Sequence, residues 1–190
     1  CIRDRDKMNL DHDIREGGVQ MILLVEDGIR YYSSILPYLY NYVLMQSKRF
    51  STEALNRHAA TLRMRGRPKV VLARTYEEAM ELYDRYSSNV LGVISDVRFP
   101  VDGEKDPDAG LKLLRHIRSE DEYVPLIIDS AESANREKAL AEGFKFVDKT
   151  SKTASIDLRH ILEEHMGFGD FIFRDPATCL LYTSELPTIL

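Results

Sequence analysis

Short apolar runs alternate with longer amphipathic stretches along most of this chain, and this alternation constrains its fold more than any other feature. Five runs have the length and composition of buried β-strands, at residues 21–25, 69–73, 90–95, 124–128 and 144–147. Between them, apolar residues recur at helical spacing. Strands that alternate with helices in this way predict an α/β fold, with a parallel sheet covered by helices on both faces.

The predicted helices follow the strands in regular order. They cover residues 29–49, 75–86, 110–118, 133–142 and 156–165, with one extra helix at 52–64. Thr75 and Glu78 form a capping-box pattern at the start of the second of these helices. Pro37 predicts either a kink in the first helix or a later start for it. The polar residues 101–109 are predicted to form a loop.

The termini differ from the body of the chain. We expect a linker at 1–20, a globular domain at 21–165 with an insertion at about 50–67, a second linker at 166–178 leading to a missing downstream domain, and a tail at 179–190. The first residues and the tail resemble translated adapter DNA. The two cysteines, Cys1 and Cys179, lie in these segments, so the body has no disulfide framework and fits a cytoplasmic location.

Charged residues follow three of the predicted strands at the point where each one ends. Asp96 follows the strand at 90–95, and Pro100 then prevents the strand from continuing. Glu26 and Asp27 follow the first strand, and Lys149 follows the fifth. Because ligands bind at the carboxyl ends of parallel strands, these groups are expected to form a site for a divalent cation and a phosphoryl group. The open alternative is that they are solvated loop residues or helix caps.

This set of residues resembles the receiver domain of bacterial response regulators, which is a CheY-like family. The matching motifs are the acidic pair Glu26-Asp27, the acceptor position Asp96, the pair Ser130-Ala131, Phe146 and Lys149. The resemblance spans residues 21–165. It implies a flavodoxin-like, doubly wound, five-stranded parallel sheet of order 2-1-3-4-5, with an extra helical insertion before the second strand.

The resemblance also implies a role for each matching residue in a phosphorelay. Asp96 is expected to accept the phosphoryl group, and Lys149 and Ser130 to contact its oxygens. Magnesium is expected on Glu26, Asp27, Asp96 and the backbone carbonyl of Arg98. Ser130 and Phe146 are expected to act as switch residues. The implied partners are a histidine kinase or phosphotransfer protein as donor and a neighbouring domain of the same chain.

A finer likeness is carried by two further stretches, residues 92–100 and 167–176. They resemble receiver-like modules fused to phosphoenolpyruvate synthase or pyruvate, phosphate dikinase-like proteins. This implies that the isolated domain catalyses only its own Mg²⁺-dependent phosphorylation, whereas the parent protein is a phosphotransferase.

Some residues depart from the family pattern and leave alternatives open. Thr150 stands where a Pro is usual, and Asp129 stands where an apolar residue is usual. One alternative is therefore a non-phosphorylated pseudo-receiver that serves as an interaction module. Another is a phosphatase with an aspartate nucleophile, although Arg98 occupies the position of its second acid. The net charge of −5 disfavours nucleic acid as a partner, and no apolar run approaches the roughly 20 residues that cross a bilayer.

Overall fold

Five parallel strands form the centre of the molecule. The computed structural model describes residues 6–52, 67–166, 173–174 and 181–182, and its main sheet has the order β2-β1-β3-β6-β7. The strands are β1 (Met21–Val25), β2 (Lys69–Ala73), β3 (Val90–Ser95), β6 (Leu126–Ser130) and β7 (Lys145–Asp148). In chain order this is 2-1-3-4-5, so the predicted flavodoxin-like, doubly wound sheet is confirmed.

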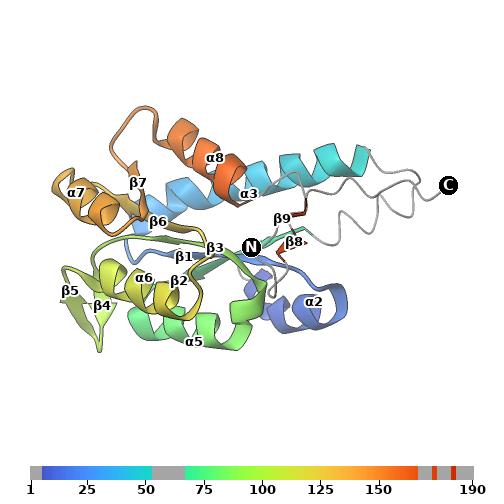
Figure 1. Cartoon of the computed structure of the whole chain (residues 1–190), viewed down its shortest axis with the longest axis horizontal. Helices are drawn as coiled ribbons and strands as arrows, with labels where there is room; N and C mark the ends of the chain where they lie inside the picture. The colour runs from blue at the N-terminus through green and yellow to red at the C-terminus, as the bar shows by residue number, and fades with distance from the viewer. Residues whose placement is uncertain (1–5, 53–66, 167–172, 175–180, 183–190) are drawn as a thin grey trace.

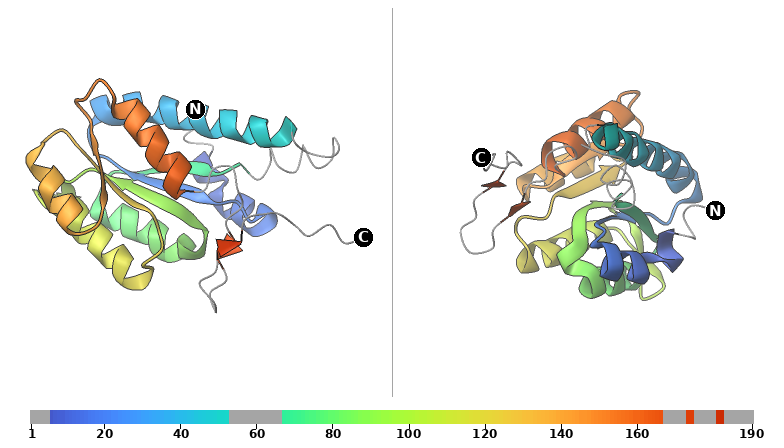
Figure 2. Two further views of the ribbon diagram at one scale, coloured as in Figure 1. Left: turned by 45° about the horizontal axis from the view of Figure 1, so that its top comes forward. Right: turned by 90° about the vertical axis from the view of Figure 1, so that its right-hand side faces the viewer.

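Helices cover both faces of this sheet (Figure 1). One face carries α3 (Ile29–Thr52) and α8 (Ala154–His165). The other carries α2 (Leu10–Gly17), α5 (Tyr76–Tyr86), α6 (Ala109–Glu120) and α7 (Ala134–Ala141), with a short 3₁₀ turn at Ser87–Asn89. Figure 2 shows the resulting three layers from the end of the molecule.

The alternation of side chains along each strand divides the core in two. Leu23 and Val93 pack into the cluster under α5 and α6, whereas Leu24 and Ile94 pack into the cluster under α3 and α8. Neighbouring strand residues point to opposite faces, and a strand buried on both faces therefore needs an unbroken apolar run. For residues at or just after the carboxyl end of a strand, the same alternation determines on which face of the sheet the side chain lies.

The structure describes most of the predicted helices and settles two details. Thr75 caps α5, since its hydroxyl accepts a hydrogen bond of 3.2 Å from the backbone N–H of Glu78. Pro37 lies inside α3, so the alternative of a later helix start is wrong. The predicted helix at 52–64 lies almost wholly outside the described residues. So do the segments after residue 166, except for the antiparallel pair β8 (Phe173–Arg174) and β9 (Leu181–Tyr182).

The prediction that residues 1–20 form a linker is wrong where the structure describes them. Leu10–Gly17 form α2, and Leu10 is 1% exposed in the core. Asp6 is also buried, and its carboxylate lies 3.3 Å from the guanidinium of Arg67 and 3.5 Å from the ammonium of Lys69. The helix was missed because it has only two turns and few apolar residues.

The predicted loop at 101–109 is also wrong, because most of it belongs to a hairpin. Strands β4 (Phe99–Val101) and β5 (Glu104–Asp106) pair antiparallel beside the end of β3. Their turn places Asp102 at φ 51° and Gly103 at φ 85°. Two adjacent residues with positive φ are typical of the type I′ hairpin turn, for which Asp-Gly is a favoured sequence.

Among the described residues, no helix has both the length and the hydropathy that crossing a lipid bilayer requires.

Candidate functional site

Three carboxylates meet where β1 and β3 end. Glu26 and Asp27 directly follow β1, and Asp96 directly follows β3. One carboxylate oxygen from each lies within 4.8 Å of the others. The backbone N–H of Asp96 donates to the carbonyl of Val25 at 2.9 Å, which extends the pairing of the two strands into the site.

A buried lysine bridges two of these carboxylates. Lys149 follows β7, and its ammonium contacts Glu26 Oε2 and lies 3.1 Å from Asp96 Oδ1. Its side chain is only 4% exposed. The ammonium also lies 4.7 Å from the ring centroid of Tyr31 on α3, within the range of a cation–π contact. Glu26, Asp96 and Tyr31 therefore hold the ammonium of Lys149 from three sides.

Burial and neighbouring charges together shift the pKa values of Glu26 and Lys149. Burial raises the pKa of Glu26 above its usual value, although the ammonium of Lys149 opposes the rise. Burial by itself would lower the pKa of Lys149, but the negative charges of Asp96, Asp129 and Glu26 outweigh it and raise that pKa. The surrounding carboxylates thus favour the charged form of Lys149.

The acidic cluster has the donor chemistry of a magnesium site. Carboxylate oxygens are the ligands that Mg²⁺ prefers, and three of them converge here. Two carboxylates about 4 Å apart repel by roughly 4 kcal/mol at an effective dielectric constant near 20. Lys149 and Lys105, which lies 2.9 Å from Asp27, provide two positive charges against these three negative ones. The donor set fits a divalent cation.

Ser130 lies at the end of β6, beside the lysine in the backbone pairing. Its carbonyl accepts a hydrogen bond of 3.0 Å from the backbone N–H of Lys149. Its hydroxyl is buried and accepts from Asn135 Nδ2 at 3.0 Å and from the N–H of Glu132 at 3.2 Å. No hydrogen bond links this hydroxyl to the acidic cluster among the residues that the structure describes. Asn135, which orients the hydroxyl, was missed because only the fold brings it there.

Phe146 lies on the same face of the sheet as Ser130. In the register of β6 and β7 it pairs with Ile128, two residues before Ser130. Its ring is half-buried and packs against the cluster under α5 and α6. The structure therefore places the two expected switch residues on the face opposite Lys149.

Arg98 and Thr150 lie at the edge of the site. The Arg98 guanidinium is exposed and lies 3.8 Å from Glu132. The backbone N–H and hydroxyl of Thr150 both donate to Asp148 Oδ1, at 2.8 and 2.6 Å. Asp148 thus fixes the turn that follows Lys149, at the position where the family has a Pro.

Gly110, at the start of α6, holds the loop that carries Asp96. Its N–H donates to the carbonyl of Val97 at 2.9 Å. A Cβ atom at this position would lie 1.9 Å from the backbone oxygen of Asp96. Only glycine permits this approach without a shift of the loop. The contact is tertiary, so the sequence predicts only a helix start at Gly110.

Asp129 differs from the other carboxylates. Strand alternation places it with its register partner Val147 on the face of α3 and α8, opposite Ser130. It is 6% exposed, and burial raises its pKa to about 7. Asp129 therefore lies on the same side of the sheet as Lys149, near enough for their charges to interact.

Comparison with known proteins identifies the architecture. No family model and no curated protein matches the chain. A response regulator receiver domain protein from Clostridium thermocellum superposes with a TM-score of 0.52 and 17% identity, over 78% of this chain and 95% of that one. The non-phosphorylated HemR receiver domain from Leptospira biflexa gives 0.52 and 21% identity, over 77% and 94%. The chain has the receiver fold.

A third solved structure gives the same result. It is the N-terminal domain of a response regulator/sensory box/GGDEF 3-domain protein from Carboxydothermus hydrogenoformans. This domain superposes with a TM-score of 0.51 and 17% identity, over 78% of this chain and 94% of that one. Nearly the whole of each receiver domain is thus matched by this chain.

Proposed function

We propose that this chain is a phosphoacceptor receiver module that takes a phosphoryl group on Asp96 and regulates a neighbouring domain. The observation that supports this most is the position of Lys149. Its buried ammonium lies 3.1 Å from Asp96 and also contacts Glu26, within a cluster of three carboxylates. A buried lysine beside an aspartate at the mouth of a parallel sheet can pair with an oxygen of an incoming phosphoryl group.

The proposed reaction transfers a phosphoryl group from nitrogen to oxygen. A carboxylate oxygen of Asp96 attacks the phosphorus of a phosphohistidine on a histidine kinase or phosphotransfer protein. The P–N bond breaks, its electron pair returns to the imidazole, and an aspartyl phosphate forms. Bound Mg²⁺, held by Glu26, Asp27, Asp96 and the carbonyl of Arg98, would neutralise charge on the transferred group. Lys149 would pair with one phosphoryl oxygen.

The proposed output runs through Ser130 and Phe146. In the structure, the Ser130 hydroxyl accepts hydrogen bonds from Asn135 and Glu132. The Ser130 hydroxyl would donate its proton to a phosphoryl oxygen, and the resulting movement of Ser130 would open space toward Phe146 on the same face. The equilibrium between two arrangements of this surface would then shift by the difference in their affinity for the phosphoryl group.

One observation favours a second candidate, a pseudo-receiver that binds a partner without being phosphorylated. The β4–β5 hairpin begins three residues after Asp96, and its Lys105 lies 2.9 Å from Asp27. A cation already present at the acidic pair reduces the attraction for Mg²⁺. This candidate predicts a folded chain that neither binds Mg²⁺ tightly nor forms an aspartyl phosphate.

For the parent protein, we propose a cytoplasmic polypeptide in which residues 21–165 regulate a pyruvate, phosphate dikinase-like region. The motif at 92–100 supports this, whereas that at 167–176 lies mostly outside the described residues. Coexpression of the chain with such a region, and measurement of its phosphotransfer rate with and without phosphorylated Asp96, tests this part separately.

The acceptor proposal is tested by intact mass spectrometry after incubation with phosphoramidate. The wild type should gain one phosphoryl mass with Mg²⁺ and none with EDTA. Asp96→Asn should gain none under either condition, and the exposed-site control Asp157→Asn should behave as the wild type does. A folded wild-type chain that gains no mass with Mg²⁺ would favour the pseudo-receiver.

A further inference from the structure

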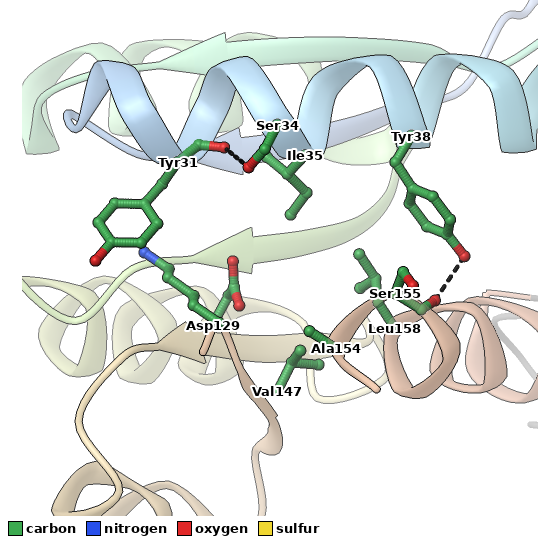
Figure 3. Close-up of a pocket in the computed structure, with 10 residues that line it drawn as sticks. Tyr31, Ser34, Ile35, Tyr38, Asp129, Val147, Ala154, Ser155 and Leu158 are labelled. Carbon is green, nitrogen blue, oxygen red and sulfur yellow. Dashed lines mark hydrogen bonds between the residues drawn. The ribbon is translucent and has the colours of Figure 1, made fainter. Parts of the chain in front are cut away.

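A cavity of about 300 Å³ lies between α3 and α8 (Figure 3). Its lining includes Lys149, the lysine that contacts Glu26 and Asp96. Its lining combines aromatic, hydroxyl, apolar and charged groups: Tyr31, Ser34, Ile35, Tyr38, Asp129, Val147, Lys149, Ala154, Ser155 and Leu158. A cavity of about 150 Å³ holds benzene, so this one has room for an apolar ring and a polar head group.

The carboxylate of Asp129 points into this cavity from the end of β6 (Figure 3). It is 6% exposed, yet it accepts no hydrogen bond and forms no ion pair with any residue in the described part of the chain. Glu26 and Asp96, by contrast, both contact Lys149. A buried carboxylate without a partner is costly, and a bound cation that donates hydrogen bonds would relieve that cost.

The rest of the lining suits a cation and disfavours an anion. The Ser34 hydroxyl donates a hydrogen bond of 2.8 Å to the carbonyl of Tyr31, so the hydroxyl oxygen can accept one from a ligand. Tyr38 donates to the carbonyl of Ser155 at 2.6 Å and so holds α3 to α8 beside the cavity. Tyrosine rings also attract cations through their faces.

Lys149 is the cation on the lining, and its ammonium is already paired with two carboxylates. An anionic ligand would therefore face Asp129 without an unpaired positive charge to receive it. Ile35, Val147 and Leu158 provide an apolar wall for a hydrocarbon body.

We propose that this cavity binds a small organic amine, with its ammonium on the carboxylate of Asp129 and its apolar body between α3 and α8. The site is separate from the proposed phosphoacceptor function, because it uses a different carboxylate and needs neither Mg²⁺ nor a phosphoryl donor.

The test is an NMR titration of the ¹⁵N-labelled full chain with benzylamine near pH 8, in EDTA and without a phosphoryl donor. Benzyl alcohol, which has a similar shape and no charge, serves as the matched ligand. We expect saturable shifts at the amides of residues 34–36, 38, 129 and 154–158. Benzyl alcohol should bind roughly 10- to 100-fold more weakly, the range for a hydrogen bond to a charged group.

Variants of the lining residues Asp129 and Ala154 test whether benzylamine binds in this cavity. Asp129→Asn should weaken benzylamine binding by a similar factor, while Asp157→Asn, which changes an exposed carboxylate on α8, should leave it unchanged. Ala154→Phe fills the cavity without touching Asp129 and should abolish binding. Circular dichroism confirms that each variant is folded.

Three results would overturn the proposal: equal binding of the two ligands, shifts centred on Glu26 and Asp96, or no saturation up to the solubility limit of benzylamine. Because the titration contains no phosphoryl donor, a failure of the acceptor proposal leaves this result unaffected.

Discussion

Acidic residues at the ends of three strands lie on the same face of the sheet but have opposite environments. At the ends of β1 and β3, Glu26 and Asp96 share the ammonium of Lys149. At the end of β6, Asp129 is buried like Glu26 but has no hydrogen bond or ion pair with any described residue. Burial alone therefore does not define a site, since the partner decides whether a carboxylate is a stabilised anion.

The difference follows from the direction in which the Lys149 side chain extends. Asp129 and Lys149 lie on the same face, yet the lysine reaches across β3 toward β1 and not back to β6. It thereby joins Glu26 and Asp96 and leaves Asp129 to the cavity between α3 and α8. One lysine thus separates a candidate phosphoryl site from a candidate ligand site.

The largest effect is expected when the shared cation is removed. Lys149→Met should lower the free energy of unfolding by about 3–5 kcal/mol, because it leaves Glu26 and Asp96 buried and uncompensated. Urea denaturation in EDTA measures this. Lys145→Met, at an exposed lysine of the preceding strand β7, should change stability by less than about 0.5 kcal/mol. Equal losses for the two variants would show that the pairing at Lys149 contributes nothing.

Removing the charge of Asp129 should instead raise the free energy of unfolding. A carboxyl group whose pKa is raised to about 7 retains its proton in the folded state after the unfolded chain has lost it. Stability is then lost as the pH rises from about 4 to 7. Asp129→Asn should therefore be stabilising by roughly 2–4 kcal/mol at pH 8 and by little at pH 4.

Urea denaturation across this pH range gives the measurement for Asp129→Asn. Asp148→Asn is the control, because hydrogen bonds from Thr150 lower the pKa of Asp148, and loss of this carboxylate should not stabilise the protein at any pH. If the effect of Asp129→Asn did not depend on pH, the pKa of Asp129 would not be raised in the folded state.

A smaller effect is expected from the contact that positions Asp96. Gly110→Ala forces the loop away from a Cβ that would lie 1.9 Å from the Asp96 oxygen. The expected cost is roughly 1–3 kcal/mol, together with slower phosphorylation by phosphoramidate. Gly17→Ala, whose Cβ would meet only a side-chain methyl of Val19 at 3.2 Å, is the control. An unchanged rate in Gly110→Ala would contradict the positioning role.

The smallest effect concerns the hairpin lysine. Lys105→Ala removes an exposed ion pair with Asp27, so stability should change by less than about 1 kcal/mol. Affinity for Mg²⁺, measured by isothermal titration calorimetry, should rise about two- to fivefold, since a competing charge is lost. Unchanged affinity would remove the observation that favours the pseudo-receiver.

The sequence predicts the sheet and the acidic cluster because both depend on simple rules. Unbroken apolar runs specify buried parallel strands, and the carboxyl ends of such strands meet at one edge, which brings Asp96 to Glu26 and Lys149. The hairpin was missed although its Asp102-Gly103 signal was present, since its strands are short and charged. Gly110 and the cavity at Asp129 depend on contacts between distant elements, for which no local pattern exists.

The most direct test of the separation between the two carboxylates is to locate the phosphoryl group. Treatment with phosphoramidate and Mg²⁺, borohydride reduction of the aspartyl phosphate to homoserine, and peptide mass spectrometry identify the modified position. We predict homoserine at position 96 alone, in the wild type and in Asp129→Asn. Homoserine at position 129, or at neither position in the folded protein, would contradict the account.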